Sequence, residues 1–282
     1  MADAKKLVKQ LARRGPHRVL KGDLGVAGLP GVIYTPESGI NLPAVAFAHD
    51  WLTPVKRYSR TFEHLASWGI VVAAPATERG PLPSDGRLAI DLSTALDVIT
   101  EVRLGSGEIT VNRGRRAVVG HGSGAGAALL AADGDEGVLA LAALFPAPTS
   151  PQAAEAATRL TVPALLLAAA GDVASVRSNA AELAAAYGGA AQLRVIPDGV
   201  AGGLPEGRLN PGAALGVTKP DKATQKAVRT VLTGFLLATA GHDSTYSDFA
   251  ASDTDLGDVV VWRPEDEEEP KRPTPLDVIR GR

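Results

Sequence analysis

Short unbroken hydrophobic runs recur along the chain and alternate with stretches in which hydrophobic residues fall three or four positions apart. The runs are typical of strands buried on both faces of a sheet, and they fall at 43–48, 70–74, 117–119, 138–144, 164–168 and 193–196. The helical spacing predicts helices at 2–14, 58–68, 88–104, 125–132, 175–187 and 222–240. Two further strands are expected at 18–24 and 32–34, on either side of a glycine-rich turn. This alternation predicts an α/β protein with a doubly wound, mostly parallel sheet and helices on both faces.

The two ends of the chain differ in charge from the part between them. Residues 1–22 contain seven lysines and arginines and one aspartate, a net charge of +6. Residues 248–269 contain nine acidic residues and one arginine, a net charge of −8. We therefore expect a basic N-terminal helix (1–16), one α/β domain (17–249) and an acidic C-terminal tail (250–282). Charged blocks of this kind are either solvated chain ends or interaction tails.

The overall composition excludes several classes of protein. Of 282 residues, 45% are hydrophobic and 21% charged, with a net charge of −2, which is typical of a globular domain and gives no reason to expect nucleic-acid binding. No apolar run reaches the ~18–20 residues of a transmembrane helix, and the first residues do not resemble a secretory signal. The absence of cysteine excludes disulfides and thiolate ligands. We expect a cytoplasmic protein, and the excess of arginine over lysine is typical of GC-rich bacteria.

The segment Gly120-His121-Gly122-Ser123-Gly124 lies between a predicted strand and a predicted helix. Hydrolases of the α/β type place their catalytic serine at the centre of such a turn, written G-x-S-x-G. Here Gly120 and Gly124 hold the flanking glycine positions, and the central residue is Gly122. Ser123 lies one position after the centre of the motif, where the catalytic serine would stand. The motif therefore indicates the hydrolase fold and argues against its usual chemistry.

Further segments strengthen this resemblance. The chain resembles the dienelactone hydrolases and the bacterial cutinase-like polyester hydrolases, within the α/β-hydrolase superfamily. The segments that carry the resemblance, which extends from about Gly31 to Phe249, are GVIYTP at 31–36, AHDW at 48–51, HLASWGIVV at 64–72, the turn at 120–124, and VPALLL at 162–167.

The resemblance implies a catalytic Ser, Asp and His in that chain order. The serine position is Gly122. The acid follows the strand at 164–168, where Asp172 retains it. The base is expected in a segment such as Asp-Gly-x-x-His, and here Asp198-Gly199 is followed by glycine at position 202. The two residues that would exchange the proton are thus replaced by glycine.

Other polar residues lie near these positions. The resemblance places His49, Asp50 and Trp51 at the mouth of the pocket, close to a main-chain donor for the oxyanion. A carboxylate such as Asp50 would repel a developing oxyanion there. His121 is also expected to line the pocket, in a structural role without proton transfer. The backbone N–H of Ser123 corresponds to an oxyanion donor, and its hydroxyl is expected to satisfy free donors at the start of the next helix, although it remains a candidate nucleophile.

Glycine at position 122 has a physical advantage once attack is no longer needed. The nucleophile of such a turn adopts a strained backbone conformation that costs of order 1–3 kcal/mol for a residue with a Cβ, and glycine adopts it at little cost.

We expect a non-catalytic, hydrolase-like protein that binds a small apolar ligand or a protein partner. Two alternatives stay open: an active esterase that uses Ser123, and an assembly factor that associates with itself or a partner through its tails, where the patch 259–262 could add a strand to a sheet edge. The spacing of histidines and acids suggests no metal site, and no cofactor is expected.

Overall fold

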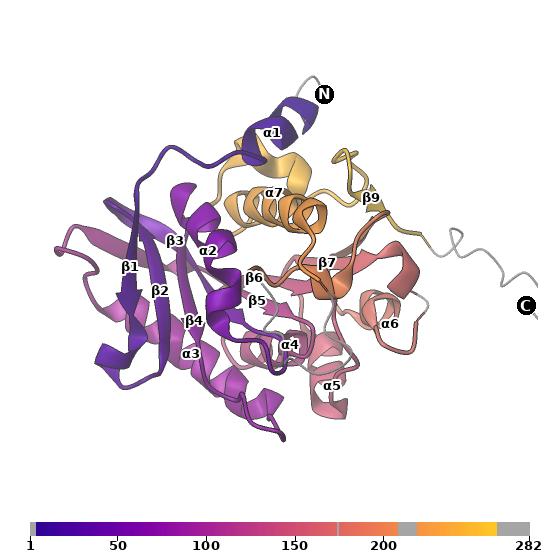
Figure 1. The fold of residues 1–282 in the computed structure, drawn as a ribbon, viewed down its shortest axis with the longest axis horizontal. Helices are drawn as coiled ribbons and strands as arrows, with labels where there is room; N and C mark the ends of the chain where they lie inside the picture. The colour runs from indigo at the N-terminus through magenta and orange to yellow at the C-terminus, as the bar shows by residue number, and fades with distance from the viewer. Residues whose placement is uncertain (1–3, 174, 208–218, 264–282) are drawn as a thin grey trace, which may run out of the picture.

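The computed structural model describes residues 4–173, 175–207 and 219–263 (Figure 1). The strands are β1 (Val19–Asp23), β2 (Gly31–Pro36), β3 (Gly39–Ala48), β4 (Val71–Pro75), β5 (Ile109–His121), β6 (Val138–Leu144), β7 (Ala164–Ala169), β8 (Ala191–Ile196) and β9 (Val260–Val261). The α-helices are α1 (Ala4–Leu11), α2 (Ser59–Ser67), α3 (Asp85–Glu101), α4 (Gly124–Asp133), α5 (Pro151–Arg159), α6 (Ala180–Ala186) and α7 (Lys222–Ala238). Short 3-10 helices are η1 (Leu24–Ala27), η2 (Val55–Tyr58), η3 (Ala170–Asp172), η4 (Ala201–Gly203) and η5 (Ser244–Phe249).

The described strands form one sheet in the order β1-β2-β4-β3-β5-β6-β7-β8-β9. Pairing is parallel from β4 through β3 to β8, whereas β1, β2 and β9 join in antiparallel fashion. The central strands are hydrophobic on both faces; every residue of β7, for example, is buried. The predicted α/β architecture is thereby confirmed, and the strand order is consistent with an α/β-hydrolase-like fold.

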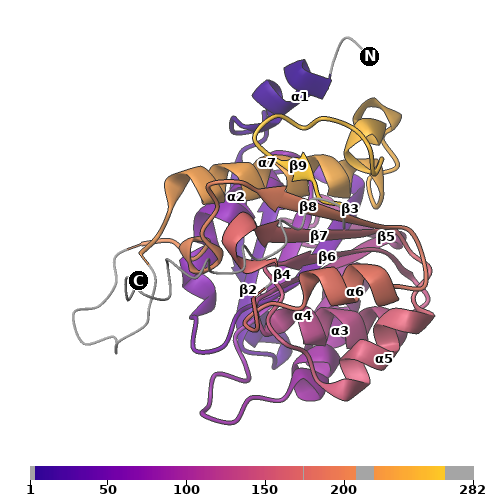
Figure 2. The ribbon, with the colours of Figure 1, turned by 90° about the vertical axis from the view of Figure 1, so that its right-hand side faces the viewer.

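Helices cover both faces of the sheet and enclose two hydrophobic cores (Figure 2). One core lies beneath α3, α4, α5 and α6, and the other lies beneath α2 and α7. Helix α1 forms an outer layer that packs on α7 and η5. The carboxyl ends of the parallel strands meet at one edge, where ligands bind in sheets of this type.

Two regions differ from the sequence expectation. Helix α5 was not predicted, because its buried positions are the alanines Ala153, Ala156 and Ala157 and its length is only nine residues. The start of the helix does carry a signal, since Ser150 accepts a hydrogen bond from the N–H of Ala153 at 3.2 Å and Pro151 follows it.

The first part of the expected acidic tail is packed on the domain. Leu256 and Val259 are buried, and β9 pairs with β8. The fully buried guanidinium of Arg194 donates to the backbone carbonyls of Ala251 and Thr254 at 2.7 and 2.9 Å. The boundary expected at residue 250 therefore moves to at least residue 263, because a buried cation in β8 holds this segment. The rest of the tail lies outside the described residues.

Candidate functional site

The turn between β5 and α4 has the geometry expected of the hydrolase motif. Gly122 has a φ of +56°, in the left-handed region that favours glycine. A Cβ at Gly124 would lie 2.6 Å from the carbonyl oxygen of His49, and one at Gly120 would overlap the backbone of Gly124. The two flanking glycines thus allow helix α4 to begin directly against strands β3 and β5.

The carboxylate of Asp50 fills the space in front of Gly122. A Cβ built at position 122 would overlap Oδ1 and Cγ of Asp50. Oδ1 accepts hydrogen bonds from the backbone N–H of Ser123 at 2.9 Å and from its hydroxyl at 3.2 Å. A carboxylate of this chain therefore lies where the nucleophile of a hydrolase would project.

Both main-chain donors that a hydrolase aims at the oxyanion have partners inside the protein. In α/β-hydrolases these donors are the N–H after the nucleophile and an N–H from the loop after β3. Here the N–H of Ser123 donates to Asp50, and the N–H of Trp51 donates to Oγ of Ser123 at 2.8 Å. An incoming carbonyl oxygen would have to displace Asp50 and Ser123 to reach them.

This arrangement corrects the expected role of Ser123. Its hydroxyl makes no capping hydrogen bond to helix α4. It bridges the loop after β3 to the turn instead, since it accepts from Trp51 and donates to Asp50. The reason is geometric: Ser123 has helical φ and ψ of −64° and −26°, whereas a capping side chain needs an extended backbone at its own position.

His121 and Tyr58 form a buried pair behind the turn. The N–H of Asp50 donates to the Tyr58 hydroxyl at 3.1 Å, and that hydroxyl lies 2.8 Å from Nδ1 of His121. Nε2 of His121 faces the carbonyl oxygen of Ala201 at 3.3 Å. Burial lowers the pKa of His121 and raises that of Tyr58. We infer that neutral His121 accepts from Tyr58 and donates to Ala201, which is the structural role expected for it.

His49 does not reach Ser123 as a base. Its Nδ1 lies 2.9 Å from the carbonyl oxygen of Asp50, and its Nε2 lies 2.8 Å from that of Thr77. Both ring nitrogens thus face acceptors, and the ring is 2% exposed. Trp51 is 47% exposed and lies at the rim of the cavity that His49 and Ser123 line. Its Nε1 donates to the carbonyl oxygen of Gly80.

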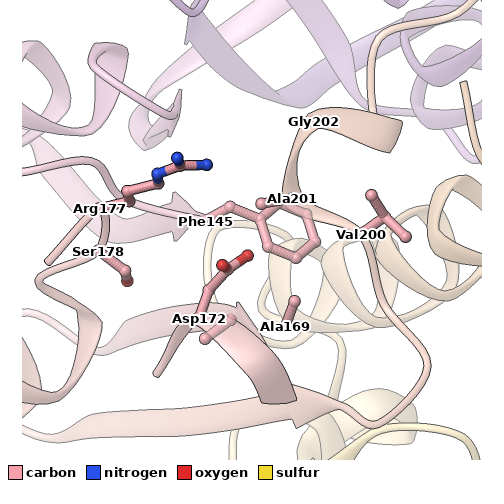
Figure 3. Close-up of a pocket in the computed structure, with 9 residues that line it drawn as sticks. Phe145, Ala169, Asp172, Arg177, Ser178, Val200, Ala201 and Gly202 are labelled. Carbon is pink, nitrogen blue, oxygen red and sulfur yellow. The ribbon is translucent and has the colours of Figure 1, made fainter. Parts of the chain in front are cut away.

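Two of the three positions implied by the resemblance line one cavity. Asp172, at the end of η3, and Gly202, in η4, border a cavity of about 290 Å³ together with Phe145 and Arg177 (Figure 3). The apolar part of its wall consists of Phe145, Ala168, Ala169, Val200 and Ala201. Among the described residues, neither the Asp172 carboxylate nor the Arg177 guanidinium has a hydrogen-bond or ion-pair partner.

Ser123 borders a different cavity, of about 250 Å³, with His49, Trp51 and Asp85. The carboxylate of Asp85 accepts a hydrogen bond of 2.5 Å from the Ser150 hydroxyl. Asp172 does not line this cavity, and Ser123 does not line the cavity at Asp172, so the two candidate catalytic residues border different cavities.

Sequence reasoning did not single out Phe145, Arg177 or Tyr58. Phe145 follows β6 with a φ of +48°, which turns its ring into the cavity at Asp172 (Figure 3). A signal existed for Phe145, since it directly follows a predicted buried strand and so lies at the carboxyl edge. Tyr58 offered no such signal, because its partners are Asp50 and His121, the latter 63 positions away.

Within the described ranges, no group of three or more His, Asp or Glu side chains is arranged to hold a metal ion. No helix in the same part of the chain is long and apolar enough to cross a membrane. Comparison with known proteins finds no family model that matches the sequence and no significant match to a curated protein.

Proposed function

We propose that this chain is a non-catalytic, α/β-hydrolase-like protein that binds a small, largely apolar ligand in the cavity beside Asp172. The observation that carries the proposal is the position of Asp50, whose carboxylate overlaps any side chain at position 122. The same carboxylate accepts from the Ser123 N–H. A negative charge held there opposes the negative charge that develops during ester cleavage.

The absence of a base at position 202 also supports a non-catalytic role. Gly202 borders the cavity with Asp172 but has no side chain to accept a proton. A serine gains nucleophilicity from a base within hydrogen-bond reach. The nearby imidazole of His49 faces two carbonyl oxygens instead.

The cavity itself favours a small ligand with one polar end. Its volume of about 290 Å³ lies at the lower end of the range typical of ligand sites. Phe145, Ala169 and Ala201 supply apolar contact, and Asp172 and Arg177 offer unpaired charges at its border. A cationic end would pair with Asp172, and an anionic end with Arg177.

Ligand-observed NMR with phenethylamine and phenylacetate tests this proposal. We expect at least one probe to bind wild-type protein at millimolar concentration. Val200→Trp should fill the cavity and weaken binding at least tenfold. Val102→Trp is the matched control, because Val102 lies outside the cavity and is also partly exposed. Equal binding to both variants would place the probes elsewhere.

Ester hydrolysis provides the second test. We expect wild-type protein and Ser123→Ala to hydrolyse p-nitrophenyl butyrate at the same rate. That rate should not exceed the residual acceleration that substrate binding gives without catalytic residues.

The alternative is an active hydrolase in which Ser123 is the nucleophile. It is favoured by one distance, the 3.2 Å between Oγ of Ser123 and Oδ1 of Asp50. A carboxylate is, however, a much weaker base than an imidazole, and the Ser123 hydroxyl already accepts from Trp51. Turnover that is lost in both Ser123→Ala and Asp50→Asn would establish this alternative.

A further inference from the structure

A third and larger cavity lies on the opposite side of the sheet from α3. It measures about 760 Å³ and lies between α1, the first half of α7 and residues 256–259. Figures 1 and 2 show α1 above α7, with the segment that leads to β9 beside them. We call it the α1–α7 groove.

The groove combines an apolar floor with charged rims. Its floor includes Ala227, Val231, Leu256 and Val259. Its rims carry the exposed lysines Lys5, Lys9 and Lys226, and the exposed aspartates Asp198 and Asp258. Lys5 has an acidic neighbour in Asp255, at 3.7 Å. Lys9 and Lys226 form no ion pair with any described residue, so two cations flank an apolar surface without a partner there.

We infer that the α1–α7 groove binds the chain's own C-terminal segment, residues 264–282. This inference concerns a surface distinct from the proposed ligand site. The segment begins with a run of five acidic residues, 265–269, and ends with the apolar residues Leu276, Val278 and Ile279. The acidic run complements Lys9 and Lys226, and the apolar residues match the floor.

The segment starts close enough to reach the groove. Val259 lines the groove and Arg263 is the last described residue before the segment. Because residues 260–261 are held in β9 beside β8, the free length counts from Arg263. Leu276 lies 13 residues beyond Arg263, a span of at most about 45 Å for extended chain. Residues 270–279 are long enough to return along helix α1, whose eight residues span about 12 Å.

Binding within one molecule is favoured over binding between two. A segment tethered four residues from its site has an effective concentration of roughly millimolar. A second copy would have to compete with that concentration. Intermolecular docking is thus an outcome that would overturn the inference.

Cysteine cross-linking in the full chain tests it, because the natural sequence has no cysteine. One variant carries Leu276→Cys with Ala223→Cys, the latter an exposed position on the groove. The control carries Leu276→Cys with Thr94→Cys, an exposed position on α3 across the sheet. Under mild oxidation, we expect the groove pair to form an intramolecular disulfide at least tenfold faster. Equal rates for the two pairs, or a predominant disulfide-linked dimer, would refute the inference.

Charge reversal checks the electrostatic part. Lys9→Glu with Lys226→Glu should slow the groove cross-link at least threefold, as should 0.5 M salt. Arg79→Glu with Arg103→Glu changes the net charge equally on exposed residues outside the groove and should leave the rate unchanged. Hydrogen exchange needs no cysteine: α1 should exchange several-fold faster in a chain that ends at Arg263 than in the full chain. Identical exchange in the two would contradict the inference.

Discussion

The carboxylate of Asp50 lies where any side chain at position 122 would have to project, and it accepts a hydrogen bond from the N–H of the next residue. The absence of a side chain at position 122 and the presence of an anion in its place are therefore two parts of one arrangement. Glycine at 122 relieves backbone strain and also leaves room for the carboxylate.

The first prediction concerns Gly122→Ser. We expect this substitution to lower the free energy of unfolding by about 2 kcal/mol, because it reinstates a strained conformation and overlaps Asp50. Adding Asp50→Ala should recover part of the loss, since it removes the overlap and leaves only the strain. Thermal unfolding of the two single variants and the double variant measures the coupling. Strictly additive losses would mean that the two positions do not interfere.

The second prediction concerns restored catalysis. Gly122→Ser with Gly202→His supplies a serine and a histidine near Asp172, but it leaves Asp50 bound to the Ser123 N–H, the donor that an α/β-hydrolase would use for the oxyanion. Adding Asp50→Ala should raise kcat/KM for p-nitrophenyl butyrate at least tenfold over the double variant, because the donor becomes available. Gly122→Ser alone should be nearly inactive.

Two outcomes would contradict this reasoning. If Gly202→His adds nothing to Gly122→Ser with Asp50→Ala, the base belongs at another position. If Asp50→Ala adds nothing to the double variant, the carboxylate is not what obstructs the oxyanion site.

The third prediction concerns pH. His64 is 8% exposed beneath α1, and burial, together with the charge of Arg229, lowers its pKa to about 4 from 6.5. The unfolded chain therefore binds a proton more readily than the folded chain between these two values. The stabilisation is complete above pH 6.5 and is lost as the pH falls towards 4, to a total of about 3 kcal/mol.

Replacing His64 should remove that dependence. We expect His64→Gln to flatten the loss of stability between pH 7 and pH 4.5, measured by urea unfolding, relative to wild type. His17→Gln is the control, because His17 is exposed, and it should follow the wild-type curve. Parallel curves for all three proteins would show that His64 is not the titrating group.

The fourth prediction concerns Arg194. Its guanidinium donates to Gln192 at 2.6 Å and to the carbonyls of Ala251 and Thr254. Arg194→Met should lower the free energy of unfolding by about 3 kcal/mol, because it leaves buried acceptors unsatisfied. Arg103→Met, at an exposed position, should change it by less than about 0.5 kcal/mol. Limited proteolysis should then cut residues 250–259 first in the Arg194 variant.

The sequence predicted the sheet well because its central strands are uninterrupted apolar runs. The run at 164–168 becomes β7, and the glycine pattern around Gly122 becomes the strand–turn–helix junction. These signals are local: they depend on hydrophobic periodicity and on the conformations that only glycine adopts freely.

Contacts between distant segments could not be predicted in the same way. Asp50 and Ser123 are 73 positions apart, and Arg194 reaches carbonyls 57 and 60 positions further along the chain. A carboxylate after β3 was recognisable as unfavourable for an oxyanion, but not as the group that occupies the nucleophile's place. Similarly, an arginine inside a strand gave no indication of the loop that would surround it.

The pairing of β9 with β8 has a consequence for the behaviour of the protein in concentrated solution. An unpaired edge strand presents free N–H and C=O groups to which another molecule can add a strand, which is a common route to aggregation. Val260 and Val261 pair with Val195 and Arg194 along part of that edge, so the patch first considered as a strand for a partner pairs within its own molecule. Mutations that release β9 should therefore reduce solubility before they unfold the rest of the sheet.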